Sequence, residues 1–586
     1  MVKNIIERLK MSKKLYKTIK ITDLKDMLNK TKELYKDKTA YKIKNQDGNY
    51  TVISHDEIRD MVDYLGTSLV DMGLKNKRIA IIGENRYEWE IAYLSIVCGT
   101  GIVVPLDKAL PKKELESLIQ RSEVEAIFFS AKFENTLKEI KQNGNNKLKY
   151  LISMDKEKTN KSVYLQKELI DSGKKLLEKG NTEFTKAKIN PEEMSIMLFT
   201  SGTTSKSKVV KLSHKNICTN LMDLGSILDV TSEDILLSVL PIHHVFECTV
   251  GFLFSLYKGA QTVFCDGLKH IVENLNEYNA TVMASVPGIY ETIYSMMIRE
   301  LKKQGKLSEV LENKEKYKNY PLTEKKKLFK EVHDLLGGNI KLFISGAAAL
   351  NPEIETNYRD FGFNIVQGYG LTETSPVVAV GTNAEYKTGS IGKAVPSVEV
   401  RLENVNSEGI GELVVKGPSV AIGYYNDEEA NKKAYDGEWF HTGDLAQIDE
   451  EGYIFICGRK KSVIVLRNGK NIFPEEMESL INQIDGVKES FIFGKQQSAD
   501  KNDVKINVEI VFDRTMINEK YQAITDNEIY QALSKKIKQI NGTLPRYKAI
   551  RGVILSEQPL IKTTTNKIKR QENLDAINKF KNTFIG

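Results

Sequence analysis

The hydrophobic positions of the N-terminal third follow two alternating periods. Segment 54–57, Ser-His-Asp-Glu, has the form of a capping box, and the apolar residues after it recur at helical spacing until Gly73. Short apolar runs at 78–82 and 102–104 indicate strands on either side of a helical stretch at 89–96. This alternation of strand and helix predicts an α/β domain with a largely parallel sheet.

The pattern changes after about residue 395, where short strands and glycine-rich turns follow one another. In 504–510 apolar and polar residues alternate strictly, which predicts a strand with one buried and one wet face. Thr525 and Glu528 form a second capping box ahead of a periodic helix. We therefore expect an α/β N-terminal domain, 1–458, with a small β-rich part, and a small mobile α+β C-terminal domain, 459–586.

Composition fits a globular protein of more than one domain, because 586 residues exceed what a single core usually supports. The net charge of +7 is small for this length and does not favour nucleic acid, although it suits an anionic substrate. Segment 301–330 mixes both charge signs and predicts an exposed helical excursion. The 5 cysteines lack C-x-x-C spacing, which favours thiols in a reducing compartment over disulfides or zinc.

The N-terminus has neither a signal-peptide core nor an apolar run of membrane-spanning length. Its first twenty residues are basic with interspersed apolar positions. We favour a solvated lead-in helix there, and a basic amphipathic helix on an anionic membrane is the alternative. We expect a cytoplasmic protein, with peripheral contact at the inner membrane face and a homodimer as open alternatives.

One polar loop stands out along the chain. The run Leu198–Lys208, Leu-Phe-Thr-Ser-Gly-Thr-Thr-Ser-Lys-Ser-Lys, follows an apolar strand and offers hydroxyls, one glycine and two lysines. Backbone N–H groups, hydroxyl donors and positive charge together suit a polyphosphate, although the Walker spacing is absent. On its own this loop is equally well explained as a polar surface turn.

Three further segments narrow the interpretation. Gln367–Pro376 places an aromatic residue, a hydroxyl and the carboxylate of Glu373 after a glycine turn, and that carboxylate alone could be a helix cap. Asp444 also follows a glycine turn, and its two oxygens could accept both hydroxyls of a ribose. Leu560–Arg570 is a basic, threonine-rich loop near the C-terminus.

In this order the four segments resemble the adenylate-forming superfamily, which includes acyl-CoA synthetases, the adenylation domains of non-ribosomal peptide synthesis and firefly luciferase. The resemblance extends from about residue 20 to 570. Local matches point within it to medium- or long-chain fatty acyl-CoA synthetases. These matches are Leu240–Glu247 (Leu-Pro-Ile-His-His-Val-Phe-Glu), Val286–Pro287, Ser345–Ala348 and Gly469–Pro474.

The resemblance implies roles for individual residues. The expected contacts to the ATP phosphates are Thr200, Ser201, Gly202, Thr203, Thr204 and Lys208. The expected contacts to the rest of the nucleotide are Ser345, Gly346, Ala347, Ala348, Gln367, Gly368, Tyr369 and Gly370, with Asp444 and Arg459 at the ribose. Thr372 and Glu373 match the contacts to the α-phosphate and Mg²⁺, and Lys567 matches the catalytic lysine.

The family chemistry would use ATP, Mg²⁺ and CoA to convert a fatty acid to an acyl-adenylate and then to a thioester. Lys461 matches the hinge about which the C-terminal domain would rotate between the two half-reactions. Acyl carrier protein in place of CoA is a close alternative, since the motifs do not encode the thiol acceptor. A non-catalytic nucleotide-binding relative is the alternative from another class.

Three departures from the family pattern in the phosphate loop motivate that last alternative. Ser205, Ser207 and Val209 stand where the family has glycine, proline and glycine, so Ser205 and Val209 should carry a conformational cost wherever a positive φ or a close phosphate approach is needed. Asn566 replaces the glycine before the catalytic lysine.

His244 is either a packed core histidine or a residue beside the acyl pocket.

Overall fold

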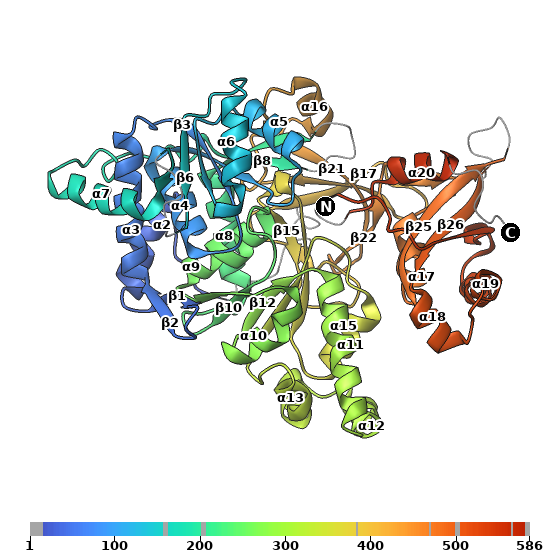
Figure 1. Ribbon diagram of the computed structural model, residues 1–586. Helices are drawn as coiled ribbons and strands as arrows, with labels where there is room; N and C mark the ends of the chain where they lie inside the picture. Colours follow the sequence, from blue (N-terminus) through green and yellow to red (C-terminus); the bar gives the residue numbers. More distant parts are fainter. Residues whose placement is uncertain are drawn as a thin grey trace.

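The computed structural model describes residues 16–155, 162–200, 207–382, 385–467, 470–497, 504–563 and 567–579. They form a large mixed α/β body and a smaller C-terminal unit, which stand side by side in Figure 1. The expected fold class is confirmed, while the mobility of the C-terminal unit stays a prediction. Within the described residues, every helix is too short or too polar to cross a membrane.

The first large sheet of the body is parallel at its centre. In spatial order its strands are β19 (Gly423–Tyr424), β9 (Lys208–Ser213), β8 (Met194–Thr200), β4 (Gly101–Leu106), β3 (Lys77–Ile82), β5 (Ala126–Phe129), β6 (Tyr150–Ser153) and β7 (Tyr164–Leu165). The strands from β8 to β7 run parallel, and β9 turns back against β8 in an antiparallel hairpin. That hairpin carries both ends of the predicted phosphate loop.

A second large sheet is separated from the first by a group of helices, which are named below. Its strands, in spatial order, are β16 (Lys393–Ala394), β15 (Val377–Val380), β14 (Ile365–Gly370), β13 (Leu342–Ser345), β12 (Val282–Ser285), β10 (Ile235–Ser238), β11 (Gln261–Phe264), β1 (Thr39–Lys44) and β2 (Tyr50–Ser54). From β14 to β1 the strands are parallel. Their carboxyl ends therefore meet at one edge, where the Ser345 and Gln367 segments leave β13 and β14.

Helices fill the space between the two sheets and cover their outer faces. The helices that share one core with both sheets are α2 (Leu24–Tyr35), α3 (His55–Asp71), α4 (Tyr87–Ser95), α8 (His214–Ile227) and α9 (Phe254–Lys258). The first sheet is covered outside by α5 (Lys112–Ser122) and α6 (Glu134–Gln142). The second is covered by α10 (Ile271–Glu277), α11 (Pro287–Lys303) and α15 (Pro352–Asp360). Helix α7 (Gln166–Glu178) packs on α3.

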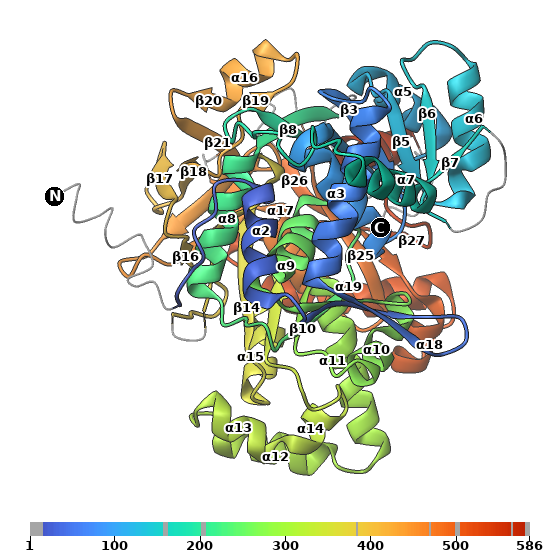
Figure 2. The same ribbon diagram turned by 90° about the vertical axis from the view of Figure 1, so that its left-hand side faces the viewer.

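Two local predictions agree with these elements. Ser54 and Glu57 form the reciprocal capping box expected at the start of α3. The charged excursion is helical and mostly exposed, in α12 (Leu307–Tyr317), α13 (Leu322–Leu328) and α14 (Lys330–Asp334). Figure 2 shows these three helices at the lower end of the molecule, below α11 and α15.

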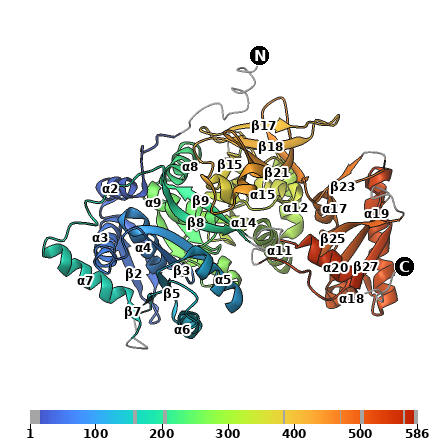
Figure 3. The same ribbon diagram turned by 90° about the horizontal axis from the view of Figure 1, so that it is seen from above.

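The β-rich part of the body is a smaller antiparallel sheet with α16 (Glu428–Ala434) beside it. Its strands are β17 (Glu399–Glu403), β18 (Gly411–Lys416), β20 (Tyr435–Asp436), β21 (Trp439–Ile448) and β22 (Ile454–Arg459). The chain passes from β22 directly into the C-terminal unit. Seen from above in Figure 3, that unit stands apart from the two large sheets.

The C-terminal unit has a sheet with helices on both faces. Its elements are β23 (Ile464–Val465), β24 (Asn471–Ile472), α17 (Pro474–Ile481), β25 (Val487–Gln496), β26 (Val504–Phe512), α18 (Arg514–Tyr521), α19 (Asp526–Thr543), β27 (Gly552–Ser556) and α20 (Arg570–Lys579). Residues of α17 and α19 pack on one face, as the alternation in 504–510 predicts. The second face is wet only in part, because Lys505 is exposed but Asn507 is buried and Leu574 and Ile577 of α20 pack on that side.

Candidate active site

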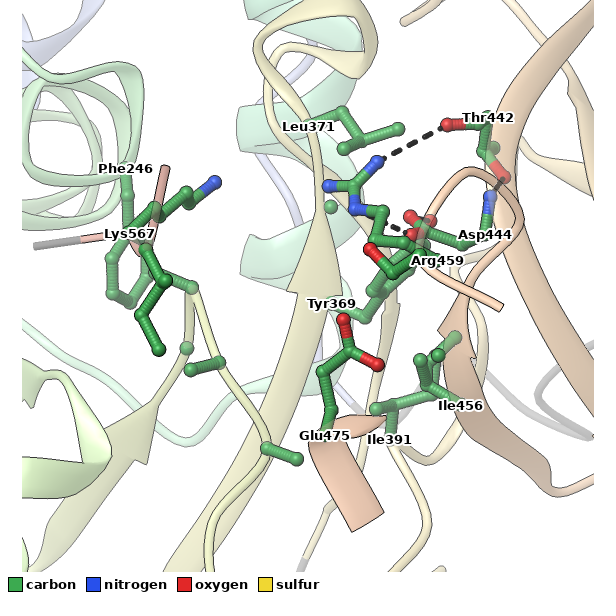
Figure 4. Close-up of a pocket in the computed structure, with 18 of the residues that line it drawn as sticks. Phe246, Tyr369, Leu371, Ile391, Thr442, Asp444, Ile456, Arg459, Glu475 and Lys567 are labelled. Atoms are coloured by element: carbon green, nitrogen blue, oxygen red, sulfur yellow. Dashed lines mark hydrogen bonds and ion pairs between the residues drawn. The ribbon is translucent and has the colours of Figure 1, made fainter. Parts of the chain in front are cut away.

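A deep cleft between the body and the C-terminal unit collects most of the residues that the sequence singled out. The lining includes Thr200, Lys208, His244, Gly346, Ala347, Ala348, Gly368, Tyr369, Gly370, Thr372, Glu373, Asp444, Arg459, Lys461 and Lys567. Figure 4 shows how Tyr369, Asp444 and Arg459 gather on one side of this cleft and Lys567 on the other. Ser201, Gly202, Thr203 and Thr204 lie outside the described residues, as do Ser205 and Asn566.

Two of the predicted nucleotide contacts lie behind the cleft wall. Ser345 is completely buried at the end of β13. The side-chain amide of Gln367 accepts a hydrogen bond from the Leu350 N–H at 2.9 Å and donates one to Glu355 at 2.9 Å. Both the oxygen and the nitrogen of that amide are therefore hydrogen-bonded within the protein. Gln367 thus stabilises the backbone that forms part of the cleft wall.

The glycine after Ser345 brings the wall close to an aromatic ring. A Cβ added at Gly346 would lie 2.9 Å from Cζ of Phe246, and Ala347 adopts a left-handed backbone with φ of 68°. Small residues at these positions thus leave a narrow slot beside Phe246, which lines the cleft. Phe252 and Phe254, by contrast, are packed in the core.

Asp444 is held by two neighbouring side chains. It lies on β21 opposite Arg459 of β22, and Arg459 Nε pairs with its Oδ1 at 2.8 Å. The Tyr369 hydroxyl donates to its other oxygen at 2.5 Å. Burial raises the pKa of Asp444, and the neighbouring Arg459 opposes that rise. Each oxygen has used one acceptor position on the protein, so one position on each is left for a ligand hydroxyl.

Glu373 is held by a tyrosine that the sequence analysis did not single out. Tyr424 of β19 donates its hydroxyl to Glu373 Oε1 at 2.7 Å, and burial together with that carboxylate raises the pKa of the Tyr424 hydroxyl. Lys208 Nζ lies 4.3 Å from the centroid of the Tyr424 ring. Tyr424 therefore joins the predicted phosphate lysine to the predicted metal-binding carboxylate. The only sequence signal for it is an aromatic pair after Gly423, which ordinary core packing explains equally well.

Lys567 enters the cleft from a short loop of the C-terminal unit. Its carbonyl accepts from the Thr563 N–H at 2.8 Å, and its N–H donates to Thr563 Oγ1 at 3.1 Å. The residue is open to solvent at the mouth of the cleft, yet desolvation and the nearby Arg459 lower the pKa of its ammonium, against the opposing charges of Asp444 and Glu373. The C-terminal unit thus stands in an orientation in which Lys567 lines the same cleft as these groups.

The described part of the β8–β9 hairpin shows whether Val209 has a positive φ. Val209 is buried in β9 opposite Phe199, and it is not among the residues with positive φ. Val209 therefore carries no positive-φ cost, because an extended strand position needs no glycine. Ser207 precedes β9 and accepts hydrogen bonds from Arg121.

Two histidines flank the apolar side of the cleft. His244 lines the cleft, and burial, with further contributions from His243 and Lys567, lowers its pKa to about 4. His243 Nε2 lies 3.6 Å from Asp107 Oδ2. His244 is therefore an uncharged imidazole at neutral pH. His244 lies at the cleft surface. This position fits a residue beside the acyl pocket better than a packed core histidine.

A buried polar network, missed by the sequence analysis, supports the histidine segment. Asn85 donates to Ser238 Oγ at 2.8 Å and to the Leu240 carbonyl at 2.6 Å. Ser238 in turn donates to Glu247 at 2.6 Å, and burial raises the pKa of Glu247 to about 8. A second buried carboxyl, Glu90, accepts from the Tyr41 hydroxyl, and burial raises its pKa well above the ordinary value.

Comparison with known proteins agrees with this arrangement. The family described as AMP-binding enzyme matches residues 28–425, and the AMP-binding enzyme C-terminal domain matches residues 461–582. The chain is 28% identical to long chain acyl-CoA synthetase 3 of Arabidopsis thaliana, over 76% of this chain and 72% of that protein. It is 27% identical to long-chain-fatty-acid–CoA ligase 5 of Rattus norvegicus, over 89% and 82%.

Solved structures share the fold over almost the whole chain. The anthranilate CoA ligase AuaEII, in complex with anthranoyl-AMP, superposes with a TM-score of 0.75 at 19% identity, covering 96% of this chain and 98% of that one. ATP-bound MatB from Rhodopseudomonas palustris gives 0.71 at 24% identity, covering 95% and 99%. Because the family match spans most of the chain and the cleft gathers the residues expected of such a site, this protein belongs to the AMP-binding enzyme family.

Proposed function

We propose that this protein is an ATP-dependent, AMP-forming ligase that activates a medium- or long-chain fatty acid and transfers the acyl group to CoA. The observation that carries the proposal is the placement of Lys567 in one cleft with Glu373, Asp444 and Arg459. The relatives named as long-chain acyl-CoA synthetases favour a fatty substrate. The cleft also has an apolar side, formed by Leu224, Leu228, Val250, Ile344 and Val377.

In the first half-reaction the fatty carboxylate would attack the α-phosphorus of ATP, and the bond to pyrophosphate would break. Two anions must meet, so the work of the protein is positioning and charge neutralisation. Lys567 would stabilise the negative charge that develops on the α-phosphoryl oxygens. Lys208 and Thr200 would hold the β- and γ-phosphates, and Asp444 would accept hydrogen bonds from the ribose.

We further propose Mg²⁺ as the cofactor, held by Glu373 with Thr372 beside it. Tyr424 occupies Glu373 Oε1, and no described residue donates a hydrogen bond to Oε2, so the carboxylate retains oxygen capacity of the kind that Mg²⁺ prefers. A bound Mg²⁺ would neutralise phosphate charge. The set of a carboxylate, a hydroxyl and nearby phosphates fits that ion.

In the second half-reaction the CoA thiol would attack the acyl carbon, AMP would leave, and the thiol proton would pass to solvent. We propose that 1–458 and 459–586 are the two domains and that the second rotates about Lys461 between the steps. The separate core of the C-terminal unit supports this division. Lys461 lies in the strand-free link after β22, where a backbone rotation changes few contacts.

The test is pyrophosphate release by purified protein with Mg²⁺-ATP and fatty acids from short to long. CoA and acyl carrier protein are supplied in parallel as acceptors. We expect release that depends on one chain-length class, with AMP and acyl-CoA as products. A thioester formed only on acyl carrier protein would replace CoA as the acceptor. Absence of release with every acid would overturn the proposal in favour of a non-catalytic nucleotide-binding protein.

A further inference from the structure

Arg121 binds Ser207, the residue that precedes β9. This arginine lies in the last turn of α5, on the outer face of the first sheet. Its Nη1 donates to Ser207 Oγ at 3.0 Å, and its Nη2 donates to the Ser207 carbonyl at 2.6 Å. Ser207 stands where the family has proline, one residue before β9. The fork of the guanidinium thus takes both acceptors of a single residue.

The same guanidinium also contacts the opposite strand of the hairpin. It lies 5.5 Å from the centroid of the Phe199 ring on β8. Phe199 is paired with Val209, and Thr200 with Lys208, at the open end of the hairpin. Arg121 therefore fixes the two strand ends between which the phosphate segment runs. A lysine could not make this set of contacts, because it lacks the planar fork and the face that stacks on a ring.

We propose that Arg121 positions Lys208 by holding Ser207 and the adjoining end of the β8–β9 hairpin. Proline would restrict position 207 by fixing φ, whereas here a neighbouring side chain holds Ser207. The inference rests on the proposed function, since it assigns Lys208 to the phosphates of ATP. Arg121 is a positioning residue that acts through Ser207.

Helix α5 does not depend on Arg121 for its own anchoring. Arg78 donates to the Ser122 carbonyl at 3.1 Å and pairs with Glu123 at 2.8 Å, so the end of the helix is held from the sheet. Leu115, Leu118 and Ile119 bury the inner side of α5. Removal of the Arg121 side chain should therefore leave the helix in place and loosen the hairpin end alone.

The experiment compares Arg121→Ala and Arg121→Lys with Lys113→Ala, which removes a charge from an exposed position of the same helix. Steady-state pyrophosphate release gives separate KM values for ATP and for the fatty acid, and thermal unfolding gives Tm. We expect R121A to raise the KM for ATP about 10- to 100-fold, the range for a lost charged hydrogen bond. The KM for fatty acid and the Tm should match those of K113A. R121K should fall between R121A and wild type.

A double-mutant cycle tests the route through Ser207. We expect Ser207→Ala to reduce the effect of R121A in part, because it removes the Oγ contact with Arg121 and leaves the contact with the Ser207 carbonyl. We expect Ser207→Pro to restore most of the ATP affinity in the R121A background. If S207P proves inactive by itself, the S207A cycle decides. An R121A effect of equal size in both backgrounds, or one on Tm and both KM values together, would overturn the positioning role.

The design separates this inference from the proposed function. If the wild-type protein releases no pyrophosphate with any fatty acid, the proposed function fails. The effect of Arg121 is then measured on the Kd for ATP by titration calorimetry. R121A should bind ATP at least tenfold more weakly than K113A does. Equal Kd values for R121A and K113A would refute the inference.

Discussion

Replacing Lys567 by alanine should separate the two half-reactions. Lys567 faces Asp444 and Arg459 (Figure 4) across the cleft that Glu373 also lines, and desolvation and the charge of Arg459 lower the pKa of its ammonium. A positive charge in such a site stabilises developing negative charge more than it would in water. Lys567→Ala should therefore slow formation of the acyl-adenylate and leave thioester formation from supplied acyl-adenylate largely intact.

The size of the effect follows from comparable charge-stabilising groups. Loss of one preorganised donor lowers kcat by about 100- to 1,000-fold, or about 2.7–4 kcal/mol. We expect the upper part of that range, because Lys567 carries a full charge and Arg459, the other cation beside Asp444, is already paired with it. Lys567→Arg should retain part of the rate, since it keeps the charge with a different shape.

The assay measures ATP–pyrophosphate exchange for the first half-reaction and thioester formation from synthetic acyl-adenylate for the second. Lys569→Ala is the matched control, since Lys569 is on the same loop and pairs with Glu572. The lowered pKa of Lys567 adds a pH test: wild-type exchange should fall as pH rises, at a pH below the ordinary lysine pKa of about 10.4. Equal loss of both half-reactions in K567A would refute the assigned role.

Three further predictions concern other parts of the molecule. Lys461→Pro should stall thioester formation while exchange continues, because proline fixes the φ of the proposed hinge, and normal CoA turnover would contradict the hinge placement. Tyr424→Phe removes the hydrogen bond to Glu373 and should lower kcat/KM for ATP about tenfold at unchanged Tm, and an unchanged kcat/KM would show that this bond is dispensable. Burial lowers the pKa of His214 to about 4, so below about pH 6.5 the unfolded chain binds a proton that the folded chain does not, and stability falls as pH falls. His214→Asn should lower stability at neutral pH and flatten this slope in urea titrations, and an unchanged slope would assign the pH dependence to other groups.

Much of the fold could be predicted because its signals are local. The helix after Ser54 is specified by a capping box and an apolar stripe within one segment. The second face of β26 could not be predicted, since Leu574 and Ile577 reach it from far along the chain. Strand alternation reports only which face is more apolar, and it does not show what a distant helix covers.

The site shows the same division. Motif residues such as Asp444 and Lys567 carry a chemical signature that can be recognised without a structure. The residues that support them do not, because their partners are distant: Tyr424 reaches Glu373 across 51 positions, and Arg121 reaches Ser207 across 86. Gln367 is the opposite case, because its place in a motif could be recognised from the sequence. The sequence did not show that its side-chain amide bonds to Leu350 and Glu355 behind the cleft wall.

The buried carboxyl Glu247 takes up a proton when the chain folds near neutral pH. Burial raises the pKa of Glu247 to about 8 in the folded protein, and it raises the pKa of Glu90 in the same direction, whereas in an unfolded chain a glutamate ionises at about pH 4.3. Folding therefore takes up protons, and for Glu247 the associated stability is lost as pH rises from about 4.3 to about 8. The measured heat of unfolding should accordingly depend on the ionisation enthalpy of the buffer that receives those protons.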